Sequence, residues 1–297
     1  MSISISPVDA TLGAEITNVD LANLSETDVQ EILDAFHQFG VLIFPQQHID
    51  DEAQINFSLH FGKMEFKTPN NKAGRVSNQK TDGSISQSNE HQTKILRGNE
   101  GWHTDSSYMP LAAKASCLSA LVVPSEGGQT AWADMRAAYD ALSQEMKDKI
   151  ADLTAYHSLY QSQAKIGHNV KTGDGYGFHA KGAPIRPLVK IHPVTNRPSL
   201  FIGRHAYRIP GMDEQEGKQL LAELMDFACQ PPRIYEHNWQ VGDLCIWDNR
   251  CVLHQARPYD YNEVRVLRHT RIAGDPRTEL VETAPDDLAD GFEVAAG

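Results

Sequence analysis

The fold is indicated first by residues 242–254, which read GDLCIWDNRCVLH. The apolar run 244–247 has the length and composition of a buried strand, and the polar residues 248–250 form a turn. A second apolar stretch follows and ends in His254. Short runs of this kind recur between turn residues at 115–123, 188–192, 199–202 and 265–272. Their spacing predicts a β-rich fold, a sandwich or barrel.

Helices are fewer and are predicted to flank the strands. Ser25 and Asp28 have the spacing of a capping box, and apolar residues recur at 29, 32, 33 and 36 before Gly40. This pattern predicts a helix of about four turns, followed by a buried strand over 41–44. Two further helices are expected over 136–151 and 213–229.

Length and composition limit the possible classes of protein. The 297 residues, 40% of them hydrophobic, suffice for one core, so residues 1–297 are interpreted as a single domain. A net charge of −12 argues against nucleic acid but leaves room for a small anionic ligand in a locally basic pocket. The first residues show neither the basic nor the long apolar region of a signal peptide, and no run approaches the ~18 apolar residues of a membrane span, so an unexported protein is expected. Its four cysteines form no CxxC pair, so a cytoplasmic location is expected.

One long stretch shows little periodicity. Residues 65–100 are rich in Asn, Gln, Ser and Lys. Such a segment is typical of a mobile loop, and we expect it to be a lid over the functional site.

The chemistry is indicated by His103 and Asp105. Two residues apart in extended backbone, their side chains point the same way and can share one metal ion. The motif is weak alone, because His48 and Asp50 repeat it; Asp50 is predicted instead to cap a helix. With His254, the first pair gives the two histidines and one carboxylate that suit Fe(II) with open coordination positions.

Eleven residues after His254, Arg265 begins a run in which Arg265, His269 and Arg271 share one strand face. A guanidinium matches a carboxylate bidentately, so Arg265 is a candidate for holding a dicarboxylic cosubstrate. Two other classes remain open from the residues alone. One is a zinc hydrolase using the same three ligands, and the other is a non-catalytic protein stabilised by a metal.

Together these segments resemble the family of taurine dioxygenase and 2,4-dichlorophenoxyacetate dioxygenase, over nearly the whole chain. The matching segments are 13–21 (GAEITNVDL), 102–105 (WHTD) and 124–130 (PSEGGQT). The resemblance implies a double-stranded β-helix (jelly-roll, cupin-like) core, Fe(II) held by His103, Asp105 and His254, and 2-oxoglutarate and O2 as cosubstrates. It also implies that Thr130 and Arg265 hold the distal carboxylate of 2-oxoglutarate, that no catalytic residue is needed beyond the metal ligands, and that the protein is a homo-oligomer.

Within that family, segments 132–142, 202–206 and 247–251 are most similar to aryloxyalkanoate dioxygenases, particularly those selective for (S)-phenoxypropionate. That group implies Arg204 as the anchor of the substrate carboxylate. Where the taurine enzyme has a sulfonate-binding arginine, this sequence has His269, so taurine is not expected as substrate. The expected reaction is hydroxylation of a small anionic aryloxyalkanoate, which then collapses to a phenol and a keto acid; an alkyl sulfate or sulfonate is the alternative. Arg271, His269 and Asn99 are further candidates for the substrate pocket, although a loop asparagine commonly just caps a turn.

Overall fold

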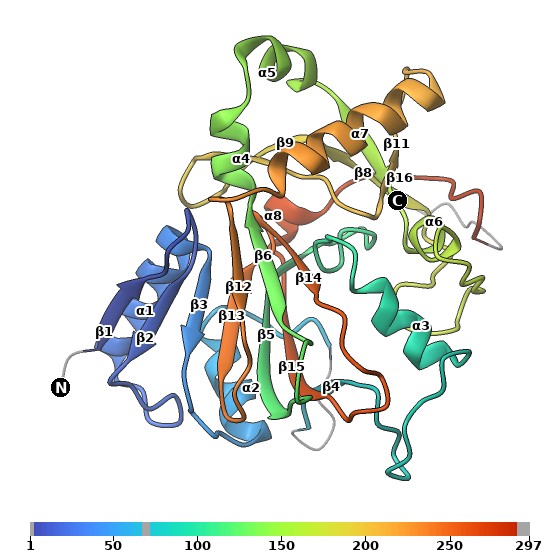
Figure 1. Ribbon diagram of the computed structural model, residues 1–297. Coiled ribbons are helices and arrows are strands. Elements are labelled where there is room, and N and C mark those ends of the chain that lie inside the picture. Colours follow the sequence, from blue (N-terminus) through green and yellow to red (C-terminus); the bar gives the residue numbers. More distant parts are fainter. Residues whose placement is uncertain (1–2, 67–71, 290–297) are drawn as a thin grey trace.

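The computed structural model describes residues 3–66 and 72–289. Its largest sheet has seven strands, antiparallel except for the parallel pair β2 and β3 (Figure 1). In spatial order the strands are β1 (Ser4–Pro7), β2 (Ala14–Thr17), β3 (Val41–Phe44), β13 (Leu244–Asp248), β5 (Ala113–Val122), β15 (Val266–Ala273) and β4 (Gly74–Ser77).

Three smaller sheets complete the β structure of the described residues. A three-stranded sheet has the order β12 (Ile234–His237), β6 (Thr130–Asp134), β14 (Val252–Ala256). A four-stranded sheet has the order β11 (Ala206–Arg208), β7 (Thr154–His157), β8 (Ala183–Pro187), β16 (Thr283–Ala284). The last pairs β10 (Pro198–Leu200) with β9 (Val189–Ile191).

The seven-stranded and three-stranded sheets face each other across a shared apolar core. Trp247 of β13 and Trp132 of β6 meet there with ring centroids 5.7 Å apart, and both are fully buried. Leu267 of β15 and Val252 of β14 belong to the same cluster. Burial of these large side chains, at about 25 cal/mol per Å² of apolar surface, holds the two sheets together.

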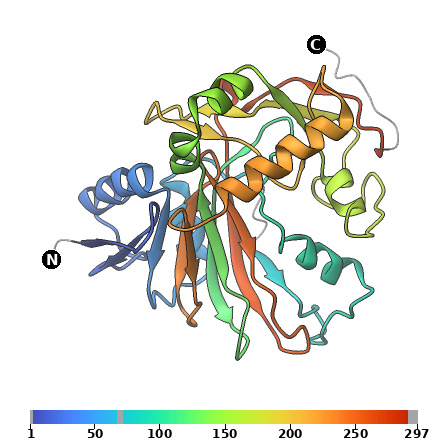
Figure 2. The ribbon, with the colours of Figure 1, turned by 45° about the horizontal axis from the view of Figure 1, so that its top comes forward.

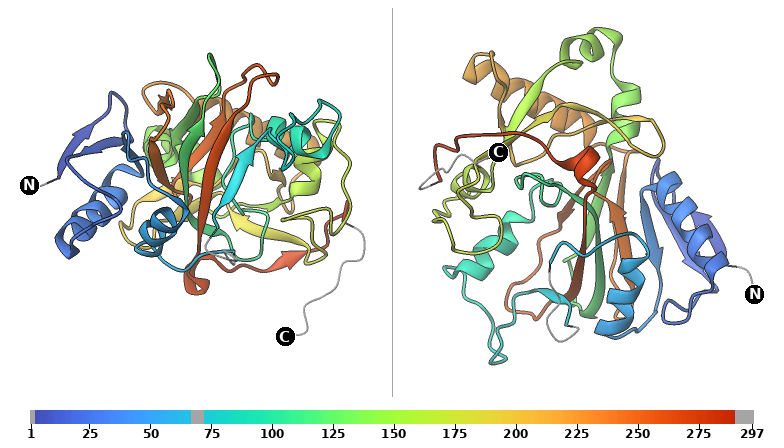
Figure 3. Two further views of the ribbon diagram at one scale, coloured as in Figure 1. Left: turned by 90° about the horizontal axis from the view of Figure 1, so that it is seen from below. Right: turned by 180° about the vertical axis from the view of Figure 1, so that it is seen from behind.

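Two helices cover the other face of the large sheet (Figure 3, right). Helix α1 (Glu26–Phe39) begins at the predicted capping box and ends at Gly40, whose φ of 74° is the left-handed conformation that glycine adopts without strain. Helix α2 (Asp51–Leu59) is capped by Asp50, which accepts a hydrogen bond from the backbone N–H of Ala53. The second histidine and aspartate pair therefore has the structural role predicted for it.

The remaining helices are α3 (His91–Gly98), α4 (Met135–Ala141), α5 (Gln144–Ile150), α6 (Leu159–Ala164), α7 (Glu214–Ala228) and α8 (Pro276–Glu279). Helix α7 lies beside α4 and β11 (Figure 2). The expectation of one helix over 136–151 was wrong. Leu142 is extended, and the side chain of Ser143 accepts a hydrogen bond from the N–H of Met146 and so starts a second helix.

The expectation of a structureless segment over 65–100 was also wrong in part. Strand β4 pairs with β15 at the edge of the large sheet, and α3 follows it, while residues 67–71 lie outside the described part. Tertiary pairing, which leaves no periodic signal in a four-residue strand, explains the difference. The β-rich fold with flanking helices is confirmed. Within the described residues no helix is long and apolar enough to cross a membrane.

Candidate metal centre and ligand pocket

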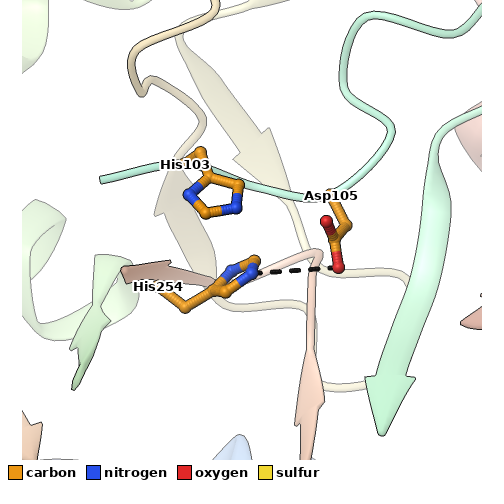
Figure 4. Close-up of side chains that lie close together, drawn as sticks. All are labelled: His103, Asp105 and His254. Atoms are coloured by element: carbon orange, nitrogen blue, oxygen red, sulfur yellow. Dashed lines mark ion pairs between the residues drawn. The ribbon is translucent and has the colours of Figure 1, made fainter. Parts of the chain in front are cut away.

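His103 and His254 are brought together by backbone pairing. An isolated bridge joins His103 to His254 of β14, with N–H to O distances of 2.9 and 2.8 Å in the two directions. The two rings therefore lie side by side, 4.1 Å apart between centroids. Asp105 follows in a turn, and its Oδ2 lies 3.8 Å from His254 Nε2 (Figure 4). One ligand atom from each of the three buried residues lies within 4.8 Å of the others.

Both histidines are held neutral. Burial, above all, lowers the pKa of His103, and it lowers that of His254 to about 4. His103 Nδ1 lies 2.8 Å from the carbonyl oxygen of Gly101, so this nitrogen donates and Nε2 keeps its lone pair. The buried Nδ1 of His254 has no hydrogen-bond partner among the described residues. Neutral imidazoles with free lone pairs are metal ligands.

The carboxylate completes the donor set. Burial opposes ionisation of Asp105, but the positive charge of Arg271 is the strongest of the opposing contributions and holds the pKa well below its usual range. Two neutral imidazoles and one ionised carboxylate form the mixed nitrogen and oxygen set that suits Fe(II). The residues present therefore fit the metal that the sequence resemblance implies.

A second buried group with metal-ligand chemistry is His192, Asp248 and Cys251. Here the carboxylate is already occupied. Arg250 binds both oxygens of Asp248 at 2.8 and 2.6 Å, and His192 Nε2 lies 3.0 Å from one of them. Burial also raises the pKa of Cys251 to about 12, which keeps it a thiol. This group is a structural ion pair rather than a metal site.

The triad opens into a cavity of about 370 Å³ between the two facing sheets. All nine site residues predicted from the sequence line this cavity: His103, Asp105, His254, Thr130, Arg265, Arg204, Arg271, His269 and Asn99. They come from segments up to 172 residues apart, from Asn99 to Arg271. The chain has a net negative charge, but four arginines and one aspartate line this pocket, so the charge is locally reversed.

Arg265 is a buried cation without an anion. Its Nε and Nη2 donate to the carbonyl oxygen of Gly128 at 3.0 and 2.8 Å, and no carboxylate of the described residues lies within ion-pair distance. A side chain at 128 would meet Arg265 Nε at 3.0 Å, so glycine is needed for this approach. Thr130 Oγ1 accepts from Trp239 Nε1 at 3.0 Å, which leaves its own hydrogen available to a ligand oxygen.

Arg204, which is partly buried, is the second cation without an anion. Its Nη1 donates to the carbonyl of Gly98, and its Nη2 donates to that of Ser162 at 2.8 Å. Burial lowers its pKa to about 10, and again no carboxylate of the described part of the chain pairs with it. A Cβ at position 98 would come within 2.6 Å of Nη1, so the last residue of α3 is small enough to let this arginine reach the pocket.

The other three candidates differ from these two. Arg271 is paired, because its Nη2 donates to Asp105 Oδ1 at 3.0 Å. His269 faces the pocket beside it, with a pKa lowered to about 3 by burial and then by the charge of Arg271. Asn99 is the C-cap residue that follows α3, and its backbone carbonyl accepts from the N–H of Ala256. Asn99 therefore combines a helix-end role with a place in the pocket lining.

Sequence reasoning missed the aromatic part of the pocket. Phe66, Tyr108, Tyr176 and Phe178 line one side of it, and we call these four residues the aromatic wall. They come from three loops without periodicity, Tyr176 and Phe178 sharing one, so the only signal was the presence of large apolar rings within polar or glycine-rich stretches. Glu65 was missed as well, although it contacts Arg271 and Tyr176 behind this wall.

Comparison with known proteins agrees with this geometry. The family model of taurine catabolism dioxygenases TauD and TfdA matches residues 4–271. An (S)-phenoxypropionate/alpha-ketoglutarate-dioxygenase of Sphingobium herbicidovorans is 50% identical over 94% of this chain and 97% of the relative, and one of Delftia acidovorans is 45% identical over 94% and 97%. A crystal structure of AAD-2 in complex with Mn(II) and N-oxalylglycine superposes with a TM-score of 0.87 at 37% identity, covering 95% of this chain and 100% of the other. With its triad, its pocket arginines and these relatives in agreement, the chain belongs to the TauD/TfdA family of dioxygenases.

Proposed function

We propose that this protein is an Fe(II)- and 2-oxoglutarate-dependent dioxygenase that hydroxylates an aryloxyalkanoate. The observation that carries the proposal is the pair of guanidinium groups without counterions, the buried Arg265 and the partly buried Arg204, which line the same cavity as the triad. Burying a cation without a partner is costly unless a bound anion compensates it. Two such cations indicate two anionic ligands, as a dicarboxylic cosubstrate and an anionic substrate require.

The roles follow from the donors that each residue has free. His103, Asp105 and His254 hold the iron, and Arg265 with the hydroxyl of Thr130 holds the distal carboxylate of 2-oxoglutarate. When bound, iron with 2-oxoglutarate and O2 supplies the oxidising power for hydroxylation, with succinate and CO2 as co-products. The chain contributes position: the pocket fixes the substrate beside the triad and keeps water out.

The substrate is proposed from charge and shape together. Arg204 is placed to bind a carboxylate, and the aromatic wall offers ring faces and edges to an aryl group. Hydroxylation of the carbon next to the ether oxygen gives a hemiketal or hemiacetal, which collapses to a phenol and a keto acid. The (S)-phenoxypropionate enzymes among the relatives support this choice over other anions.

An alkyl sulfate or sulfonate is the second candidate. An alkylsulfatase of Acinetobacter baylyi is 30% identical over 97% of this chain. Arg204 would bind a sulfate as well as a carboxylate, but the aromatic wall favours an aryl substrate. The zinc hydrolase alternative finds no support, since the relatives are dioxygenases and a hydrolase has no use for the unpaired Arg265.

The finer features of the fold belong to the same proposal. We infer that the facing seven-stranded and three-stranded sheets form a double-stranded β-helix, supported by the shared core around Trp132 and Trp247. Residues 1–297 are interpreted as one catalytic domain, cytoplasmic and homo-oligomeric, with a lid in the region 65–100. Phe66 and His91 of that region line the pocket, and Glu65 contacts the pocket residue Arg271, which supports a lid.

The test is succinate formation by protein purified without oxygen and then given Fe(II), 2-oxoglutarate and air. Phenoxypropionate enantiomers, other aryloxyalkanoates, sulfonates and sulfate esters are compared, with His103→Ala as the control. We expect succinate and a phenol in equal amounts with one aryloxyalkanoate and neither in the variant. Equal succinate with every compound, or succinate without phenol, would contradict the proposed substrate, and failure of the folded protein to bind 2-oxoglutarate would contradict the reaction class.

A further inference from the structure

Arg271 is bound by acidic groups on two sides. Its Nη2 donates to Asp105 Oδ1 at 3.0 Å, its Nη1 donates to Ser106 Oγ at 3.1 Å, and its Nε lies 3.6 Å from Glu65 Oε2. It is therefore unlike Arg204 and Arg265, because its charge is already compensated within the protein. This pairing leaves it poorly suited to anchor a substrate anion, the role that the sequence suggested for it.

The contact with Arg271 makes the two oxygens of Asp105 different. Oδ1 is held by the guanidinium, whereas Oδ2 accepts from Ser116 Oγ at 2.5 Å and faces His254 Nε2 at 3.8 Å. A carboxylate fixed in this way offers the metal one oxygen in a fixed orientation. Groups that hydrogen-bond to a metal ligand in this way fix its orientation and affect the affinity for the metal.

Arg271 is itself held by two segments that are far apart in the sequence. Its guanidinium carbon lies 5.3 Å from the ring centroid of Phe66 and 5.4 Å from that of Tyr176, and the two rings meet edge to face at 4.5 Å. Tyr176 Oη donates to Glu65 Oε1 at 2.6 Å. These contacts restrict a long side chain that would otherwise sample many rotamers. We call Glu65, Phe66 and Tyr176 the Arg271 clamp.

We infer that Arg271 is a positioning residue for Asp105, and that the Arg271 clamp couples part of the aromatic wall of the pocket to the orientation of the metal-binding carboxylate. The inference deepens the proposed function and rests on it for the identity of the metal site. Coupling is reciprocal. If the clamp favours metal binding, then a bound metal must stabilise the clamp.

The first experiment measures Mn(II) affinity, with Mn(II) as a probe that needs no turnover. Arg271→Gln is expected to weaken binding by about 10- to 100-fold. Tyr176→Phe keeps the ring and changes no charge, so its expected weakening of about fivefold reports the hydrogen bond to Glu65 alone. Glu65→Gln should weaken binding at least as much, and the double variant by less than the product of the two single effects, because both remove one interaction.

The matched control is Arg268→Gln. Arg268 lies on the opposite face of the same strand and pairs with Asp51 at 2.6 Å, away from the pocket. It should change Mn(II) affinity by less than about twofold, the scatter expected of a distant site. Wild-type Mn(II) affinity in folded Tyr176→Phe and Glu65→Gln would overturn the inference.

Hydrogen exchange gives a readout that does not depend on affinity. Peptides containing Tyr176 should exchange more slowly when wild-type protein is loaded with Mn(II), and this protection should disappear in Arg271→Gln at saturating metal. Exchange that is insensitive to metal in the wild type would contradict the coupling. The two proposals fail separately: absence of succinate formation refutes the dioxygenase, whereas intact metal affinity in the clamp variants refutes the coupling.

Discussion

Two pairs of arginines with little solvent exposure differ in how their charge is compensated. At the end of β6 and after β13, Arg136 pairs with Asp134 at 3.0 Å and Arg250 pairs with Asp248 at 2.6 Å, and all four side chains are almost fully buried. In the pocket, Arg204 and Arg265 have no carboxylate partner among the described residues. The first group balances its charge within the chain, and the second group is balanced only when an anion binds. Uncompensated charge, rather than burial, thus marks the ligand site.

Arg186 shows why the lack of a carboxylate is not sufficient by itself. It is also buried and outside any ion pair, yet its Nε, Nη1 and Nη2 donate to backbone carbonyls of Ser107, Glu279, Met109 and Pro110. Every nitrogen is used, and Arg186 does not line the pocket. Arg204 and Arg265 differ from Arg186 because their guanidinium groups line the cavity and each keeps a nitrogen that makes no hydrogen bond to the described residues.

The largest expected effect is on stability, in the paired group. Asp248→Asn removes the charge that compensates Arg250 while preserving shape. We expect the free energy of unfolding to fall by about 3–5 kcal/mol, because a buried cation is left without a counterion. Equilibrium unfolding in urea measures this. A loss below about 1 kcal/mol would mean that the buried pair is not what balances Arg250.

Arg265→Gln should have the opposite effect, because it should lower ligand affinity and leave the stability of the protein nearly unchanged. Stability of the ligand-free protein should stay within about 1 kcal/mol of wild type or rise, since an uncompensated cation is removed. Affinity for 2-oxoglutarate or N-oxalylglycine should fall about 100-fold through loss of charged hydrogen bonds. Thermal unfolding with and without the ligand measures both quantities together. A large loss of stability with unchanged ligand affinity would place Arg265 in the structural group.

This division was only partly visible in the sequence. The metal triad was predicted from the spacing of His103 and Asp105 together with His254. The shared face of Arg265, His269 and Arg271 was predicted from strand alternation, and Arg265 directly precedes β15. The difference between Arg265 and Arg271 was not predicted, because it depends on Asp105 and Glu65, which only the folded chain brings within reach. The break between α4 and α5 had a local signal in Ser143, whereas the aromatic wall had only a weak one, large rings within polar or glycine-rich loops.

A smaller effect is expected for Arg204→Gln. Because Arg204 is proposed to anchor the substrate, KM for the preferred aryloxyalkanoate should rise about tenfold, while affinity for 2-oxoglutarate stays unchanged. Arg204→Lys retains the charge and should recover part of the loss, although it lacks the planar fork. Steady-state kinetics with each cosubstrate varied in turn distinguish the two ligands. An equal loss of affinity for the aryloxyalkanoate and for 2-oxoglutarate would indicate general disruption of the pocket.

The smallest expected effect concerns pH, where the unpaired cations act on the neighbouring imidazoles. Burial lowers the pKa of His254 to about 4, and for His103 burial is joined by repulsion from His254 and Arg204. A lowered pKa keeps an imidazole neutral as pH falls, and only the neutral form binds metal. An imidazole with the ordinary pKa of about 6.5 would lose roughly tenfold in affinity between about pH 7 and pH 5.5. Mn(II) titrations over that range should instead show less than about a twofold change in the wild type.

Arg204→Gln removes one of the charges that lower the pKa of His103, so the variant's loss of Mn(II) affinity in acid should begin at a higher pH than in the wild type. Identical pH profiles in the two proteins would show that burial alone keeps the ligands neutral and that the unpaired cation serves only its anion.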